Sequence, residues 1–217
     1  MSVGVRRIAR LVGVPFAAVA LLAGCAGSPP DPADEKVRDR AGHAVVGLDA
    51  RLAPLLRQHE VLADWSADYC LNDPLTTFDW QCTATRNVAL EVEDLHAGAV
   101  AVDTELTRLG CHPTGDPSVM GLATMIDNHP DRQHPADLPM VHFNCGQDDV
   151  FVQPSDEADP AWTGSLERPG AWPEQSTGED GNRLMGGGAM TPDEATALRE
   201  AAGPLLLVTA TRGYHSE

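Results

Sequence analysis

Residues 205–211 read Leu-Leu-Leu-Val-Thr-Ala-Thr, and this stretch decides the kind of fold that the chain can form. The run is almost continuously apolar and rich in β residues, so it predicts a strand in the middle of a sheet, covered on both faces. Just before it, residues 191–194 (TPDE) place a capping residue, a proline at the first helical position and an acid in the first turn. We therefore expect a short helix there, which runs to about Ala202 and is ended by Gly203.

Two pairs of segments alternate apolar and polar residues with the period of two that half-buried strands require. The first pair has apolar residues at Trp65, Ala67 and Tyr69, and at Phe78, Trp80, Cys82 and Ala84; the second pair has them at Val141, Phe143 and Cys145, and at Val150 and Val152. Residues 146–149 (GQDD) form the expected turn between the last two segments. We expect two hairpins, with the end of a preceding helix as the alternative for residues 65–69.

In two longer segments, apolar residues recur at the spacing of one helix face. In residues 34–64 apolar residues recur every three, four or seven positions, which predicts a helix with a kink or a restart at Pro54. From Val88 to Leu109 the spacing is 4-3-4-3-4-3, with Asn87 as the expected N-cap and Gly110 as the expected end. We interpret the stripe of this second helix as a face packed on a sheet rather than as a coiled-coil seam.

The expected order is helix, hairpin, helix, hairpin, long loop, helix and strand. This order predicts one α+β domain over residues 37–217, in which a mostly antiparallel sheet has helices packed on one face. Residues 113–137 and 154–190 have no sustained period and are rich in proline, glycine and aspartate. We expect both to be long irregular loops, and loops of this length are either functional or mobile.

The N-terminus has the order of an export signal. Arg6, Arg7 and Arg10 precede an apolar run that is shorter than the roughly 20 residues a membrane-spanning helix needs, and the run ends in Leu-Ala-Gly-Cys at residues 22–25. One alternative is an ordinary cleaved signal peptide, in which the cysteine at residue 25 stands by chance. The arginine pair also allows twin-arginine export, although general secretion fits the following residues better.

The Leu-Ala-Gly-Cys sequence resembles the lipobox of bacterial lipoproteins, and the resemblance covers only residues 1–25. It implies that residues 1–24 are a signal peptide and that Cys25 is lipidated, with acyl chains such as palmitate. The mature lipoprotein would then lie on the extracytoplasmic face of the plasma membrane. Residues 25–36, rich in proline and glycine, form the expected tether.

The chain is strongly acidic, with 15 Lys+Arg against 32 Asp+Glu and a formal charge of −17. Removal of residues 1–24 leaves 12 basic and 32 acidic residues, so the mature charge is −20. This charge argues against a nucleic-acid partner and against docking on anionic lipid. We expect a monomer that contacts the membrane through its lipid anchor, with an envelope protein or polymer as its partner.

Four cysteines remain besides Cys25, an even number that is typical of disulfide-bonded exported domains. Of the three connectivities, we favour Cys70–Cys82 and Cys111–Cys145, because the first pair flanks an Asn-Asp-Pro turn signal at residues 72–74. Zinc ligation by these cysteines is not indicated, since no close pair such as C-x-x-C exists.

No catalytic motif stands out, so we expect a protein that is not an enzyme and needs no cofactor. The nucleophile motif G-x-S-x-G is absent, and His59-Glu60 lacks the second histidine of a zinc-protease motif because Ala63 stands there. A group of histidines within residues 112–142 makes His129, His134 and His142 candidate metal ligands. Solvated histidines in turns and strands are the alternative.

Two classes of function remain. The first is a non-catalytic binding or interaction module that uses the long loops, with Trp162 and Trp172 at or near its contact surface. The alternative for these tryptophans is that they fold back and seal the open face of the sheet. The second class is a metal-binding or hydrolytic domain that uses the histidine-rich stretch 112–142.

Overall fold

The computed structural model describes residues 30–31, 33–71, 80–115, 121–129, 138–155, 183–187, 191–201 and 203–216. In chain order the elements are α1 (Glu35–Leu56), β1 (Glu60–Leu71), β2 (Gln81–Glu91), α2 (Leu95–Arg108), β3 (His112–Thr114), α3 (Leu122–Asp127), β4 (Val141–Asn144), β5 (Asp148–Ser155), β6 (Arg183–Gly187), α5 (Pro192–Glu200) and β7 (Leu205–Ser216).

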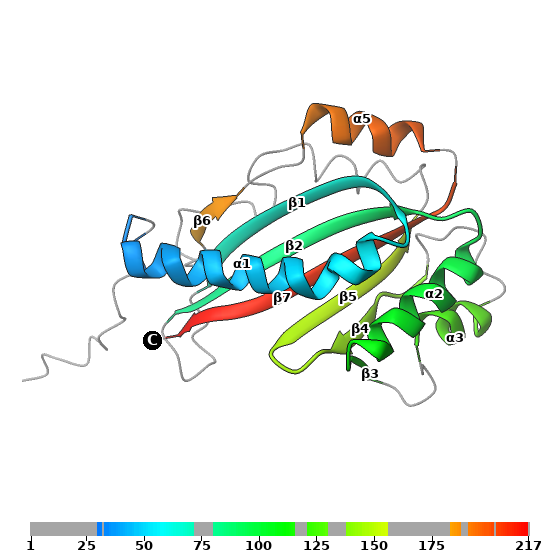
Figure 1. Ribbon diagram of the computed structural model, residues 1–217, viewed down its shortest axis with the longest axis horizontal. Helices are drawn as coiled ribbons and strands as arrows, with labels where there is room; N and C mark the ends of the chain where they lie inside the picture. The colour runs from blue at the N-terminus through cyan, green and yellow to red at the C-terminus, as the bar shows by residue number, and fades with distance from the viewer. Residues whose placement is uncertain are drawn as a thin grey trace, which may run out of the picture.

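The strands form one sheet of seven in the order β3-β4-β5-β7-β2-β1-β6, and each pairing is antiparallel. The apolar run at the start of β7 lies between β5 and β2, so its predicted central position is confirmed (Figure 1). The two predicted hairpins are formed by β1 with β2 and by β4 with β5.

One face of the sheet is covered by α1, which lies across the long strands, and by α2 and α3 beside it (Figure 1). Successive residues of a strand point to opposite faces, and Leu206, Val208 and Ala210 of β7 point toward these helices. They join the buried side chains of α1, α2 and α3 in the main core. The predicted α+β class, with a mostly antiparallel sheet and helices packed on one face, is confirmed.

The shorter helix α5 packs on the other face, at one corner of the sheet. Its Leu198 lies in a small core with Ala63, Leu205 and Leu207, which alternate with the residues of the main core. The predicted start of this helix is confirmed and forms a capping box, because the Thr191 side chain accepts from the Glu194 backbone and the Glu194 carboxylate accepts from the Thr191 backbone. Among the described residues, α5 is the only helix on this face.

The helix expected from Val88 to Leu109 is wrong at its beginning. β2 continues to Glu91, and α2 begins at Leu95 with Asp94 as its N-cap, whose carboxylate accepts a 2.7 Å hydrogen bond from the Ala97 backbone. The reason is that residues four apart share a face in a strand as well as in a helix. Val88 and Val92 therefore fit either period.

The helix expected over residues 34–64 is too long, since α1 ends at Leu56 and β1 already begins at Glu60. Pro54 lies in the last turn of α1, so the chain does not restart as a helix beyond it. Three short elements fall in stretches that were expected to be irregular: most of β3 and all of α3 in 113–137, and β6 in 154–190. Elements of three to six residues are too short to show a period.

Both favoured disulfides are formed. Cys70–Cys82 joins two residues that pair directly across β1 and β2. Cys111–Cys145 joins the residue before β3 to the residue after β4, so it fastens the three-residue edge strand to its neighbour.

Candidate functional site

The sheet face turned away from α1, α2 and α3 carries two adjacent rows of side chains that cross six strands. The strand registers place the members of each row opposite one another, and alternation along each strand puts both rows on the same face. From β3 to β1, the first row is Thr114, His142, Phe151, Thr209, Asn87 and Trp65, and the second row is His112, Asn144, Asp149, Thr211, Thr85 and Ala67. We call these residues the two-row face.

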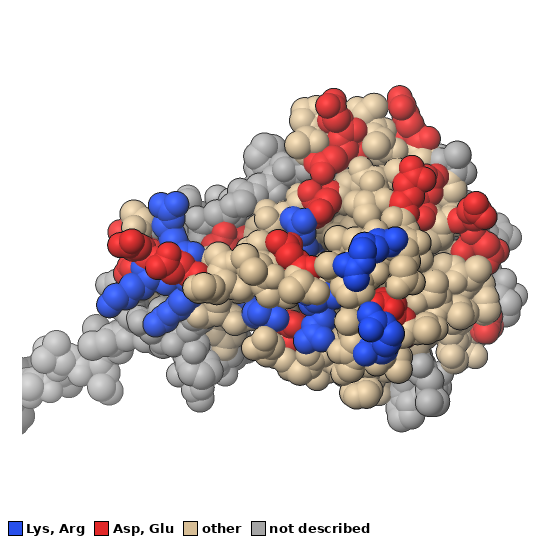
Figure 2. Space-filling model, viewed as in Figure 1, with Lys and Arg blue, Asp and Glu red and all other residues tan. Residues whose placement is uncertain are grey.

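The two-row face is almost free of charge. Lys, Arg, Asp and Glu make up 22% of the chain, yet Asp149 is the only one of them on this face. The charged residues in the middle of the same strands, such as Arg86, Asp148 and Arg212, make ion pairs with partners that include residues of α1. The side of the sheet that α1 covers carries both basic and acidic side chains (Figure 2). The acidic first turn of α5 lies on the side of the two-row face, at the corner that α5 covers.

Access to the two-row face differs between its ends. His112, Thr114 and Asn144 are exposed, and the side chains of His142 and Asp149 are 37% and 44% exposed. Toward β2 the accessibility falls, since Thr85 is only 8% exposed. The most exposed part of the face is therefore its end from β3 to β5, and Thr209 and Thr211 of β7 beside it are half-buried.

His142 occupies the centre of this accessible part and holds three strands together. Its Nε2 lies 2.7 Å from Oδ1 of Asp149 on β5, and its Nδ1 lies 2.6 Å from the hydroxyl of Thr114 on β3. The Asp149 carboxylate accepts from Nε2, and the Thr114 hydroxyl lies within hydrogen-bond distance of both Nδ1 and the His142 carbonyl, the latter at 3.2 Å. The ring also stacks on Phe151, with centroids 4.5 Å apart. These contacts fix the imidazole in one orientation.

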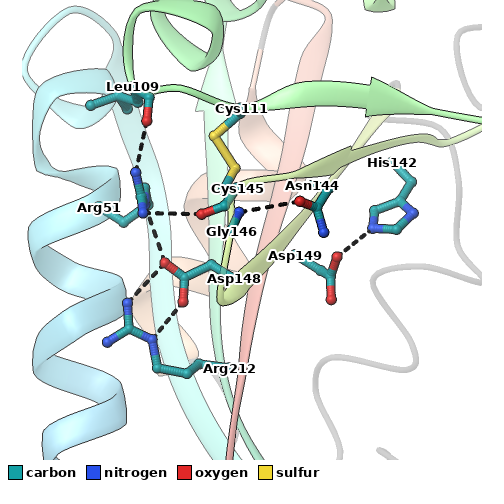
Figure 3. Close-up of a disulfide and its surroundings, with 10 residues drawn as sticks. All are labelled: Arg51, Leu109, Cys111, His142, Asn144, Cys145, Gly146, Asp148, Asp149 and Arg212. Carbon is teal, nitrogen blue, oxygen red and sulfur yellow. Dashed lines mark hydrogen bonds and ion pairs between the residues drawn. A yellow bond between two sulfur atoms is a disulfide. The ribbon is translucent and has the colours of Figure 1, made fainter.

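The neighbouring residue Asp148 points the other way, into the layer between the sheet and α1 (Figure 3). Its carboxylate is fully buried and accepts hydrogen bonds from Nε and Nη2 of Arg212, at 2.5 and 2.8 Å, and from Nε of Arg51 at 3.2 Å. Arg51 also donates to the backbone carbonyls of Leu109 and Cys145. This network, which we call the Asp148 cluster, ties α1 to the turn between β4 and β5.

The close packing of α1 on the Asp148 cluster depends on a glycine. A β-carbon at Gly47 would overlap the guanidinium of Arg212, so a larger residue there must displace that side chain. The hydrogen bonds from Arg212 to Asp148 hold the pKa of Arg212 above its ordinary value. The arginine therefore stays charged, and the strands beneath the two-row face are held from behind by a fixed ionic layer.

The predicted metal ligands are not gathered in the part of the chain that can be described. His129 follows α3 and its Nδ1 lies 2.8 Å from the Met125 carbonyl, while His142 is held in β4 as above. His134 lies outside the described residues. Within the described ranges no group of three or more His, Cys, Asp or Glu side chains is placed to hold a metal ion.

Three further predicted site residues, Cys25, Trp162 and Trp172, also lie outside the described residues. The same is true of most of the two loops that were expected to form the contact surface. Among the described residues, no helix is long and apolar enough to cross a membrane.

Sequence patterns missed most of the two-row face. Of its accessible residues, the histidine-rich stretch considered for metal binding included His112 and His142, and His142 was the one named as a ligand. Asp149 and Phe151 alternate with Asp148 and Val150, so their common face was available from the strand period. Thr114 was not available, because its contact with His142 spans 28 residues and depends on the pairing of β3 with β4.

Comparison of the chain with protein-family models, with curated proteins and with solved structures gives no match.

Proposed function

We propose that the protein is a lipoprotein, anchored to the membrane on its extracytoplasmic face, that acts as a non-catalytic binding module. The two-row face is its contact surface. The observation that carries this proposal is the near absence of charge from a wide, partly exposed sheet face in a chain with a net charge of −17.

A sheet side that meets only water has no reason to exclude charged residues, because polar and charged side chains suit a solvated face. Binding surfaces, in contrast, lose charge at their centre: this holds for protein interfaces, and ligand sites are lined mainly by apolar and aromatic side chains with a few polar groups. The two-row face follows the second pattern, with Phe151 and His142 at its accessible end and Thr209 and Thr211 beside them.

The layers behind the face support binding. The Cys111–Cys145 disulfide and the Asp148 cluster fasten β3, β4 and β5 to each other and to α1. The His142 side chain is held by Thr114 and Asp149. Since little has to be ordered when a ligand arrives, a larger share of the contact energy appears as affinity.

The lipobox-like sequence at residues 22–25 supports the location. The stretch from Cys25 to α1 is about ten residues, which at roughly 3.5 Å per residue reaches about 35 Å at most. A domain tethered in this way stays close to the bilayer and meets partners of the cell envelope. The acidic chain favours attachment through lipid over direct contact with anionic headgroups.

Fatty-acid labelling tests the location. Cells fed an alkyne fatty acid are expected to tag the protein, and Cys25→Ser is expected to abolish the tag because it removes the sulfur that is acylated. Gel fluorescence after click labelling measures both. Equal labelling of the serine variant would contradict lipidation at this residue.

Photo-cross-linking tests the contact surface. Phe151 is replaced by p-benzoylphenylalanine, which keeps an aromatic ring at the accessible end of the two-row face. Irradiation of intact cells is expected to join the protein to envelope material through this position, because only groups in direct contact react.

A further inference from the structure

We infer that the ligand of the two-row face is an uncharged polyhydroxylated molecule, a neutral oligosaccharide or the neutral polysaccharide of which it is part. This inference rests on the proposed function and adds the chemical class of the ligand. It is carried by the juxtaposition of hydroxyl and amide side chains with a fixed pair of stacked rings on a surface without free charge.

Charge decides first between classes of ligand. The chain as a whole repels polyanions, and the two-row face has no Lys or Arg that would hold one. A cationic ligand would seek carboxylates, but the single carboxylate of the face, Asp149, is already hydrogen-bonded to His142. A neutral ligand is the one that the surface accepts without uncompensated charge.

The hydrogen-bonding groups of the two-row face indicate which kind of neutral ligand it suits. Thr209 and Thr211 stand side by side along β7, with Asp149 and Phe151 opposite them on β5, and Asn144 follows on β4. A threonine hydroxyl offers one donor and two lone pairs, and an asparagine amide offers both donors and an acceptor. Sugar hydroxyls likewise donate and accept at the same atom. The side chains of the face and the hydroxyls of a sugar can therefore pair in either direction. Thr209 donates to Asn87 at 2.9 Å and keeps lone pairs for a ligand.

The rings supply the apolar part. His142 and Phe151 lie nearly parallel, with an angle of 15° between their planes, and His142 is locked by Thr114 and Asp149. The pair is therefore a fixed stack of two rings beside hydroxyl and amide groups, and Phe151 is its apolar member. Sugar rings present C–H groups beside their hydroxyls, and aromatic side chains pack against such surfaces while neighbouring polar groups bind the hydroxyls.

A protein partner is less well matched to this surface. Protein interfaces depend on large apolar anchors that are buried on binding. The large apolar side chains that are exposed among the described residues are Val46, Val61, Val100 and Met140, and none of them belongs to the two-row face.

The test is calorimetric titration of the full lipidated protein in a detergent without sugar headgroups. The probes are neutral gluco-, manno-, galacto- and arabino-oligosaccharides, with oligogalacturonate as the charged counterpart. At least one neutral probe is expected to bind, and oligogalacturonate is expected to bind more weakly. Removing one hydrogen-bonding or stacking group is expected to weaken the best neutral probe about tenfold.

The variants are Thr211→Val, which keeps a β-branched side chain and removes the hydroxyl, and Phe151→Leu, which keeps an apolar side chain and removes the ring. Thr107→Val on the exposed side of α2 is the matched control and is expected to leave the affinity unchanged. Thermal melts of each variant identify a folding defect, and the conservative Thr211→Val keeps the test valid if Phe151→Leu is unstable.

Three results would overturn the inference: no heat with any neutral probe, tighter binding of oligogalacturonate, or full affinity in both variants. The photo-cross-link from position 151 distinguishes a failure of the carbohydrate inference from a failure of the proposed contact surface. An adduct with an envelope protein would keep the proposed contact surface and reject the carbohydrate, whereas no adduct with envelope material would reject both.

Discussion

Asp148→Asn is expected to lower the free energy of unfolding by about 3–5 kcal/mol, because it removes the charge that two arginines share in a buried site. Asp149→Asn, one residue further along β5, is expected to change it by less than about 1 kcal/mol, since the pair it forms with His142 is partly exposed. The two variants make the same chemical change at adjacent positions. The difference between the two losses of stability therefore compares a carboxylate on the buried face of β5 with one on its partly exposed face.

The large effect follows from what remains after the substitution. Asp148 is 0% exposed, whereas the side chains of Arg51 and Arg212 are 23% and 16% exposed. An amide has no charge to balance them, and one of its two terminal atoms is a donor that faces a guanidinium. Both arginines would then be held between α1 and the sheet without a counter-ion.

Urea denaturation followed by circular dichroism measures both variants. The midpoint is expected to fall strongly for Asp148→Asn with an unchanged slope, since the surface exposed on unfolding stays the same. Equal losses in the two variants would mean that the Asp148 cluster does not anchor the sheet to α1.

Loss of the Cys111–Cys145 disulfide is the second large effect. The double variant Cys111→Ala/Cys145→Ala is expected to lose about 4 kcal/mol, and Cys70→Ala/Cys82→Ala about 3 kcal/mol, because a closed loop restricts the unfolded chain more when it is longer. The sequence separations are 34 and 12 residues. In both pairs the half-cystines are buried in the core.

The Cys111–Cys145 disulfide also stabilises the structure around it. Cys145 receives a hydrogen bond from Arg51 at its carbonyl, and its N–H donates to the Asp148 carbonyl at 2.8 Å. Without the cross-link, β3 depends on its pairing with β4, on the contact of Thr114 with His142 and on the backbone hydrogen bond from Cys111 to Leu106. Chemical denaturation of both double variants tests the ranking, and a larger loss for Cys70–Cys82 would contradict it.

The parts of the fold that could be predicted are those with strong local patterns. The start of β7, the two hairpins and the capping box of α5 depend on neighbours within a few residues. The boundary at residues 88–95 could not be placed, because Val88 and Val92 satisfy both the strand and the helix period. Strand β3 has three residues, and only its pairing with β4 identifies it.

The candidate site was harder to predict for the same reason. Each row of the two-row face takes one residue from each of six strands, and the strand order interleaves distant segments, as where β7 lies between β5 and β2. Alternation along one strand shows that Asp149 and Phe151 share a face. It does not show that Thr209 and Thr211 lie next to them, since that proximity depends on the register.

The histidines illustrate the same limit. His142 stood out from composition as a metal ligand, and in the structure its two ring nitrogens lie within hydrogen-bond distance of Thr114 and Asp149. Those partners lie 28 and 7 residues away along the chain, and only the pairing of β3, β4 and β5 brings them together.

The claim that the two-row face is the contact surface is tested most directly by the yield of photo-cross-linked product at position 151 in intact cells. The same photoreactive residue at exposed Thr107 on α2, on the helical side of the sheet, is the control. We predict an adduct with envelope material from position 151 that is several times more abundant than from position 107 and that is lost in the Cys25→Ser background. Equal yields from the two positions, or cross-links from position 151 only to residues 156–182 of the same chain, would contradict the account.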